Sequence, residues 1–308
     1  GFCVVAMSSS SQKCPKEFGG AERDRYKRGK RLGQGSFAEV FACCKCSDER
    51  QIFAVKAIDL QALRLRGSGE RALRKLQREA TILQKIKPHE NLVQFVDFVQ
   101  QENWYLFVLE YVHGGNLGDC IRNRQGKNGG VNPLREDEVR TIFRQLVEAL
   151  QHLHSEGVIH RDVKLENVLV AQEGTVKKDF KIKLTDFGLS KEVGDGMSAA
   201  CSTVGSPSYM APEMLQPSTH DFKADLWSLG ILLFVMLSGG RYPFNGDQQA
   251  AKVQQHQIEQ EVFNLQASEA ARSVLLGLLR QCPEERPSLE DLRGHEWLRP
   301  PPSPSELP

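Results

Sequence analysis

The sequence predicts an α+β fold with two lobes, a small β-rich N-terminal lobe that contains one helix and a larger, mainly helical C-terminal lobe. Two observations support this prediction. Short apolar runs separated by turn residues dominate up to about residue 111, whereas helical patterns dominate after Gly114 and Gly115. The chain has 308 residues, 40% hydrophobic and 26% charged, which is enough for one bilobal unit or for two small domains with buried cores.

The N-terminal lobe is expected over about residues 26–111. From residue 30 to 58 the apolar residues stand in short runs around Ser47 and Asp48, which indicates strands joined by a turn. The expected elements, two strands, one helix and two further strands, are residues 40–44, 53–56, 70–86, 92–98 and 104–111.

A hinge is expected at about residues 110–116, and the C-terminal lobe at about 117–298. Residues 135–155 place an apolar stripe at helical spacing, and Gly157 directly after them suits a C-terminal cap. The most apolar stretch, residues 226–237, falls well short of the ~20 residues that span a bilayer. A buried helix is therefore predicted there.

The two ends of the chain, residues 1–25 and 299–308, are expected to be tails. The first is rich in Ser, Lys and Gly, which predicts disorder. Its apolar start, Gly1 to Ala6, is shorter than the ~7 to 15 residue apolar core of a signal peptide, and Met7 could be the true start. The second is Pro-rich, and Pro300 to Pro304 could adopt polyproline II and bind an SH3-like module. The alternative is a disordered tail without a partner.

Charge and cysteine content limit the expected partners and compartment. A formal net charge of +1 gives no electrostatic reason to expect nucleic acid or a membrane as the main partner. Of eight cysteines only Cys43, Cys44 and Cys46 are close together, and no second Cys or His pair follows them at zinc-finger spacing. A reducing compartment, the cytoplasm or the nucleus, is therefore expected.

Three acid-bearing motifs follow one another in the middle of the chain. They are His160-Arg161-Asp162-Val163-Lys164-Leu165-Glu166-Asn167, then Asp186-Phe187-Gly188, then Ala211-Pro212-Glu213. Motifs of this kind, in this order, are typical of protein kinases, and the chain resembles that family from about Tyr26 to Leu298. The segments around Asp186, before Ala211 and at His295-Glu296-Trp297-Leu298 most resemble the calcium/calmodulin-dependent-kinase-like group. The resemblance implies the bilobal protein kinase fold and a Ser/Thr protein kinase that uses ATP and Mg²⁺ on protein substrates with Ser or Thr acceptors.

Gly33-Gln34-Gly35-Ser36-Phe37-Ala38 resembles the kinase glycine-rich loop, in which backbone N–H groups approach the phosphates of ATP. Ala38 stands in place of the third glycine, which a dinucleotide-binding fold would also accept. Such a fold needs a helix directly after the glycines, whereas this sequence predicts two strands. The hairpin is therefore favoured, and the resemblance assigns Gly33 and Gly35 to ATP.

The resemblance places Lys56, on the second of these strands, against the α- and β-phosphates of ATP; a surface lysine is the alternative. Glu79 favours the first interpretation. Leu76, Glu79 and Leu83 are spaced i, i+3, i+7, so the carboxylate lies on the apolar face of its helix, where an unpaired charge is costly. Glu79 needs a cation, and the kinase family pairs this Glu with Lys56.

A further set of residues is assigned to the adenosine part of ATP by the resemblance alone. Backbone groups at the hinge would bind adenine, apolar side chains would enclose the ring, and an amide in place of the usual acid would bind a ribose hydroxyl. In that order the residues are Glu110 and Val112, then Val40, Ala54 and Leu169, then Asn116.

The resemblance also assigns the chemistry. Asp162 would orient the substrate hydroxyl and accept its proton, and Lys164, which is typical of Ser/Thr and not of tyrosine kinases, would lie against the γ-phosphate. Asn167 and Asp186 would hold Mg²⁺, which prefers oxygen ligands. Two structural expectations accompany these roles: Asp225 accepts backbone N–H bonds from the catalytic loop, and Arg286 pairs with Glu213.

A pseudokinase, a scaffold module that binds ATP without efficient transfer, is the main competing function. Pseudokinases typically lose one of three residues, and here Lys56, Asp162 and Asp186 are all present. A small-molecule kinase of similar fold is disfavoured by the complete Ala211-Pro212-Glu213 segment.

Ser202 and Thr203 are candidate sites of activating phosphorylation. They stand just before Gly205, where kinases with an Arg before the catalytic Asp commonly carry a phosphate, and Arg161 is that Arg. Lys191 could converge on the same point. The alternative is that both are polar loop residues of a constitutively active kinase.

Overall fold

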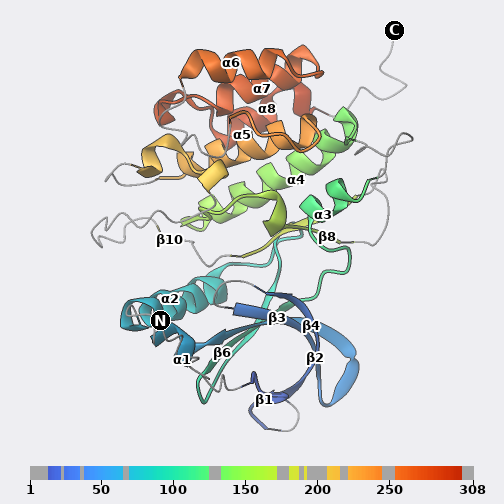
Figure 1. The fold of residues 1–308 in the computed structure, drawn as a ribbon, viewed down its shortest axis with the longest axis vertical. Helices are drawn as coiled ribbons and strands as arrows, with labels where there is room; N and C mark the ends of the chain where they lie inside the picture. Colours follow the sequence, from blue (N-terminus) through green and yellow to red (C-terminus); the bar gives the residue numbers. More distant parts are fainter. Residues whose placement is uncertain are drawn as a thin grey trace, which may run out of the picture. The chain divides into compact units, whose positions relative to one another are not determined.

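The computed structural model describes residues 13–21, 24–34, 38–64, 69–124, 133–171, 180–186, 191–192, 207–215, 221–244 and 254–299. The chain forms two compact units, one of Gly1–Gln84 with Gln94–Tyr111 and the other of Lys85–Val93 with Val112–Pro308. The first is built on a β-sheet and the second mainly on helices, which confirms the predicted α+β class (Figure 1).

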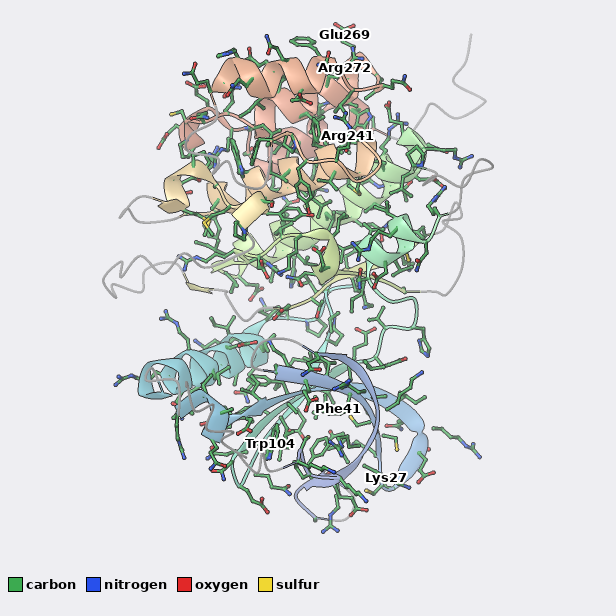
Figure 2. All side chains as sticks on the ribbon, viewed as in Figure 1. Lys27, Phe41, Trp104, Arg241, Glu269 and Arg272 are labelled. Carbon is green, nitrogen blue, oxygen red and sulfur yellow. The ribbon has the colours of Figure 1, made fainter. Side chains whose placement is uncertain are left out.

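The first unit is built on a six-stranded antiparallel sheet. Its strands are β1 (Glu17–Gly19), β2 (Arg25–Gln34), β3 (Ala38–Lys45), β4 (Asp48–Asp59), β5 (Phe95–Gln101) and β6 (Trp104–Glu110). They are hydrogen-bonded in the order β1-β2-β3-β4-β6-β5, and each pair is antiparallel. Alternate residues of these strands face one core, which contains Phe41 and Trp104, both labelled in Figure 2. The predicted strands and hairpin are therefore present.

Within the described residues 13–21, strand β1 corrects the prediction that residues 1–25 form a disordered tail. Phe18 of β1 is 1% exposed and stacks on Tyr26 with 5.4 Å between ring centroids, and Cys14 is buried in the same core. Strand β1 pairs with β2, and Gln101 at the end of β5 bonds to its other side, accepting from the Gly19 N–H and donating to the Glu17 carbonyl at 3.3 Å each. Strand β1 thus covers the free edge of β2, and the Gln101 side chain links β1 to the end of β5, the strand at the opposite edge of the sheet.

Two helices complete the described part of the first unit. Helix α1 (Leu60–Leu63) begins where the Asp59 carboxylate accepts the N–H groups of Gln61 and Ala62 at 2.8 and 3.1 Å. Helix α2 (Gly69–Lys85) is the helix expected at residues 70–86. Its apolar stripe includes the buried Ile82 and Leu83.

The second unit is mainly helical. Its helices are α3 (Leu117–Arg122), α4 (Glu136–Ser155), α5 (Lys223–Leu237), α6 (Gln255–Phe263), α7 (Glu269–Leu278) and α8 (Leu289–Gly294). The predicted stripe of α4 is confirmed, since Val139, Ile142 and Leu146 are all 0% exposed. Gly157 has φ of +75°, the left-handed conformation of the expected cap. None of the helices in the described residues combines the length and apolar character needed to cross a bilayer.

Helix α5 is buried almost throughout, as the apolar run predicts, and it packs against α4 and α7 (Figure 1). Gly230 makes the close approach to α7 possible. A Cβ atom there would lie 2.9 Å from Leu278 Cβ and 2.9 Å from Leu279 Cδ2, which is shorter than side chains tolerate. Short antiparallel strands supplement the helices: β7 (Val158–Ile159) with β10 (Lys191–Glu192), and β8 (Val168–Val170) with β9 (Ile182–Leu184).

Candidate active site

The loop that carries Asp162 follows β7 and is held by a buried carboxylate on α5. Asp225 is 0% exposed, and its two oxygens accept the backbone N–H groups of His160 at 2.9 Å and Arg161 at 2.7 Å. These bonds confirm the role expected for Asp225. Arg161 has φ of +67°, so this carboxylate supports a left-handed backbone conformation that costs about 1–3 kcal/mol in a non-glycine residue.

The structure adds His154, which the sequence analysis missed. Its Nε2 atom lies 2.9 Å from Asp225 Oδ2, so one oxygen contacts both the ring and the His160 N–H. Burial favours a raised pKa for the Asp225 carboxyl, but the hydrogen bond and charge of His154, with those of the loop, hold its pKa below the ordinary value. A sequence signal existed, because His154 follows Leu150 by four residues and therefore stands on the apolar stripe of α4.

Asp162 is 7% exposed, and polar neighbours fix its carboxylate. Lys164 Nζ donates to Asp162 Oδ2 at 2.6 Å, and Asn167 Nδ2 donates to the same oxygen at 2.9 Å. Asn167 Nδ2 also contacts the Asp162 carbonyl oxygen at 2.8 Å. Three of the residues that the resemblance assigns to catalysis and to the metal are therefore brought together within one short loop, which ends in the 3₁₀ turn η3 (Leu165–Asn167).

The second predicted metal residue, Asp186, is positioned by the pairing of β8 with β9. Val168 lies opposite Leu184, and beyond this pair the Thr185 N–H donates to the Asn167 carbonyl at 2.9 Å. Asp186 is the next residue, with φ of +66°. His160 strengthens the link, since its Nε2 lies 3.1 Å from the Thr185 carbonyl oxygen. The amide of Asn167 and the carboxylate of Asp186 supply oxygen donors of the kind that Mg²⁺ prefers, and the bond between Thr185 and Asn167 joins the two segments that carry them.

In the first unit, the expected ion pair between Lys56 and Glu79 is present. Lys56 on β4 places its Nζ atom 3.1 Å from Glu79 Oε1 on α2. The Lys56 side chain is 19% exposed and that of Glu79 5% exposed, so the ammonium accompanies a carboxylate that is largely removed from water. The pair thus connects the sheet to the helix.

The residues assigned to adenosine fall on both units. In the first unit Val40 lies opposite Lys56 in the β3–β4 pair, and Ala54 lies opposite Leu109 in the β4–β6 pair. Gly33, which the resemblance assigns to the loop over the ATP phosphates, lies opposite Val40 in the β2–β3 pair. The Glu110 N–H donates to the Gln94 carbonyl at 2.9 Å, which ties the end of β6 to the segment before β5. The assignment of these residues to nucleotide binding stays a prediction.

In the second unit, Leu169 on β8 forms a β-bridge with Asn116, and Val112 is the first residue of the segment Val112–Pro308. Asn116 is the N-terminal cap of α3: its Oδ1 accepts the Asp119 N–H at 2.8 Å and its Nδ2 donates to Asp119 Oδ2 at 2.6 Å. Sequence reasoning did not foresee this capping role, and the ribose contact stays a prediction. Gly35, Ser202 and Thr203 lie outside the described residues.

The predicted contact between Glu213 and Arg286 is confirmed. Arg286 Nη1 and Nη2 donate to Glu213 Oε1 and Oε2 at 2.6 and 2.8 Å, a two-pronged pair. The guanidinium, fully buried, also lies 5.2 Å from the centre of the Trp227 ring. Since Trp227 is on α5 with Asp225, the same helix positions the catalytic loop and the segment that contains Ala211-Pro212-Glu213.

Comparisons with known proteins agree with this arrangement. Residues 26–298 match the protein kinase domain. The chain is 34% identical over 282 residues to calcium/calmodulin-dependent protein kinase type 1 of Caenorhabditis elegans, covering 90% of this chain and 75% of that protein. It is 33% identical over 276 residues to CBL-interacting protein kinase 24 of Oryza sativa subsp. japonica, covering 89% and 56%.

A longer relative is the hormonally up-regulated neu tumor-associated kinase homolog of Xenopus tropicalis, 34% identical over 306 residues. The alignment covers 96% of this chain but only 41% of that protein, so the chain spans about two fifths of its length. From the matched domain and these identities we conclude that the chain belongs to the protein kinase family, with relatives in its calcium/calmodulin-dependent-kinase-like group.

Proposed function

We propose that this chain is a Ser/Thr protein kinase that transfers the γ-phosphoryl group of ATP to Ser or Thr hydroxyls of protein substrates. The observation that carries this proposal is the hydrogen-bonded group of Asp162, Lys164 and Asn167 on a loop supported by the buried Asp225. A fixed carboxylate can orient a hydroxyl nucleophile, and an ammonium beside it can stabilise the negative charge of the phosphoryl group that is transferred.

Each residue of the group has a separate task. The Asp162 carboxylate accepts a hydrogen bond from the substrate hydroxyl, which orients the oxygen for attack, and takes its proton as transfer proceeds. Its two donors at 2.6 and 2.9 Å keep the carboxylate in one orientation. Lys164 can turn its remaining N–H bonds toward the transferred phosphoryl group, where an ammonium stabilises negative charge as a point charge.

The donor set also supports ATP and Mg²⁺ as the co-substrate and cofactor. Asn167 and Asp186 would hold Mg²⁺, which when bound neutralises phosphate charge and orients the phosphoryl group for transfer. Lys56, held by Glu79 at 3.1 Å, is a preformed cation for phosphate oxygens. The pseudokinase alternative has no support from the residues present, because Lys56, Asp162 and Asp186 are all retained.

The proposal is tested by phosphorylation of peptides that differ only in the acceptor, Ser, Thr or Tyr, with Mg²⁺ and ATP. Asp162→Asn is expected to lower kcat by about 10²–10⁴-fold while the affinity for ATP stays within about twofold, because Asp162 faces the hydroxyl and not the nucleotide. Asp137→Asn removes the same charge at a side chain of α4 that is 65% exposed, and is the matched control.

Wild-type activity on Ser and Thr peptides, with Asp137→Asn near wild type, supports the proposal. Asp162→Asn activity within threefold of wild type, with contaminating kinases excluded, would contradict the assigned role of Asp162. Equal activity on Tyr peptides would contradict the interpretation of Lys164.

A further inference from the structure

Arg122, in the last turn of α3, lies beside the catalytic loop because the residue one turn before it has no side chain. A Cβ atom added at Gly118 would lie 3.4 Å from Arg122 Nη1 and 3.4 Å from Leu165 Cβ. The guanidinium therefore extends back over Gly118, next to the first residue of η3. This arrangement brings a cation on α3 to the loop that carries Asp162.

Two carboxylates contribute negative charge at this guanidinium. Arg122 Nη2 donates to Asp119 Oδ1 at 2.6 Å, and Asp119 is held in turn by Asn116. The second carboxylate is Glu166, whose side chain is exposed on η3. The hydrogen bond to Asp119 is the largest influence that raises the pKa of the Arg122 guanidinium, and the charges of Asp119 and Glu166 add to it.

This cluster is open to solvent and close to the reactive carboxylate. The side chains of Arg122 and Asp119 are 60% and 57% exposed. Glu166 directly precedes Asn167, whose amide nitrogen is 2.9 Å from Asp162 Oδ2. A peptide advances by about 3.3–3.6 Å per extended residue, so Glu166 is within reach of substrate residues a few positions from an acceptor hydroxyl at Asp162.

The charges determine what such a peptide meets. Asp119 and Glu166 alone would present two negative charges and would attract a basic substrate side chain. Arg122 supplies a positive charge that both carboxylates act on, so the cluster of three has a formal charge of only −1. A basic substrate residue would also have to compete with the bond of Arg122 to Asp119 at 2.6 Å.

Building on the proposed kinase function, we propose that Arg122 is a specificity-determining residue. It interacts with the carboxylates of Asp119 and Glu166 that a basic side chain of the substrate would otherwise meet, and it thereby suppresses selection for basic peptides. The competing interpretation is a solvated surface ion pair that no substrate contacts.

The test compares kcat/KM for peptides with one Ser acceptor and either Arg or Ala at each position within four residues of it. In the wild type the Arg/Ala ratio is expected to stay below about threefold at every position. Arg122→Gln is expected to raise the ratio by about three- to fivefold at one or two adjacent positions on one side of the acceptor, the size of an exposed charge pair. The change should be mainly in KM and should shrink in 0.5 M salt, as screening shortens the reach of charges.

Three further variants separate the proposed role from a general charge effect. Arg122→Lys keeps the positive charge and should keep the wild-type ratio. Arg293→Gln removes the same charge at an exposed residue of α8, and should leave the ratio unchanged. In an Asp119→Asn/Glu166→Gln background, Arg122→Gln should produce no gain, because the carboxylates that it would expose are absent.

Three outcomes would each overturn the inference while the kinase function stands. They are an unchanged Arg/Ala ratio in Arg122→Gln, the same rise of the ratio in Arg293→Gln, and a strong requirement for Arg in the wild type. A wild type that phosphorylates no peptide would overturn the kinase function and this inference with it. Because Arg122 is an exposed side chain, its variants are expected to fold, and an unchanged thermal unfolding midpoint verifies this before kinetics are compared.

Discussion

The carboxylate of Asp225 connects single-residue electrostatics to the shape of the catalytic loop. Burial alone would raise its pKa, but the hydrogen bond and charge of His154, the charge of His160 and the Arg161 N–H together lower it. A carboxyl whose pKa is lower in the folded than in the unfolded chain stabilises the fold at pH values above its unfolded pKa. That contribution disappears as pH falls through the folded pKa.

Asp225→Asn is therefore expected to lower the free energy of unfolding at pH 7 by about 2–4 kcal/mol, because an amide accepts the loop N–H groups with one neutral oxygen. The gap in unfolding midpoint between wild type and variant should narrow below about pH 4, near the unfolded pKa of Asp. Urea denaturation at a series of pH values measures both. Asp137→Asn, at an exposed side chain, should leave the midpoint nearly unchanged; a gap for Asp225→Asn that is constant down to pH 3 would contradict the argument.

Variants of the ion pair between Lys56 and Glu79 distinguish its contribution to stability from its contribution to catalysis. Lys56→Met removes an ammonium 3.1 Å from a carboxylate that is 5% exposed, and is expected to cost about 1–3 kcal/mol of unfolding free energy. Lys56→Met/Glu79→Met should be more stable than Lys56→Met, because the double change removes the buried charge as well. Both variants should lose transfer activity by orders of magnitude. Thermal denaturation and peptide kinetics check the two effects, and a Lys56→Met protein as stable as wild type would show that Glu79 does not need this cation.

Among the elements, the three-residue strand β1 is expected to contribute strongly to stability, because it places Phe18 in the core of the first unit. Phe18→Ala is expected to cost about 3–5 kcal/mol, the usual range for a buried Phe, because the side chain is 1% exposed against Tyr26. Phe263→Ala makes the same chemical change at a side chain that is 61% exposed, and should cost less than about 0.5 kcal/mol. Urea denaturation of the two variants side by side measures the difference. Equal costs would mean that β1 is not part of the folded core.

The sequence predicts those elements that are long enough for their apolar residues to form a repeating pattern. Helix α4 is expected at residues 135–155 and occurs at Glu136–Ser155, because an apolar stripe repeated over five turns has one helical interpretation. Strand β1 and the six-residue α3 are too short for any periodicity to accumulate. The position of β1, and with it the burial of Phe18, depends on residues that are distant in the sequence. One is Gln101, which bonds to Gly19 across 82 positions, and such a contact cannot be predicted from the local sequence.

At the scale of the whole molecule, a sequence motif predicts site residues that are close in the chain, but it does not predict contacts between residues that are far apart. Asp162, Lys164 and Asn167 lie within six residues, so the chain keeps them close, and the family resemblance assigns their joint role. The partnership of Asp225 with His154 joins residues 71 positions apart, and the role of Asn116 as a cap depends on where α3 begins. Family resemblance supplies the Glu213–Arg286 contact, which spacing could not.

Regulation by phosphorylation is also a property of the whole molecule. Strand β10 pairs with β7 so that Lys191 lies opposite Ile159, two residues before Arg161. The segment that leads to Ser202 and Thr203 therefore starts beside the strand that leads into the catalytic loop. A phosphate of about −1.5 to −2 charges on either residue would attract the Arg161 guanidinium and could order the segment around the catalytic loop. Ser202 and Thr203 themselves are outside the described residues, so this stays a prediction.

Removal of phosphate from wild-type protein, verified at both residues by mass spectrometry, is expected to lower the initial rate of peptide phosphorylation by about tenfold, within the usual range of coupling between sites. Ser202→Ala/Thr203→Ala should show the same low rate whether or not it has been treated with phosphatase, since it cannot carry the charge that orders the segment. Its unfolding midpoint should match that of dephosphorylated wild type, which separates loss of regulation from loss of fold. A dephosphorylated wild type and a double variant that both retain full activity would mean that the chain is constitutively active and that Arg161 serves the loop without a phosphate.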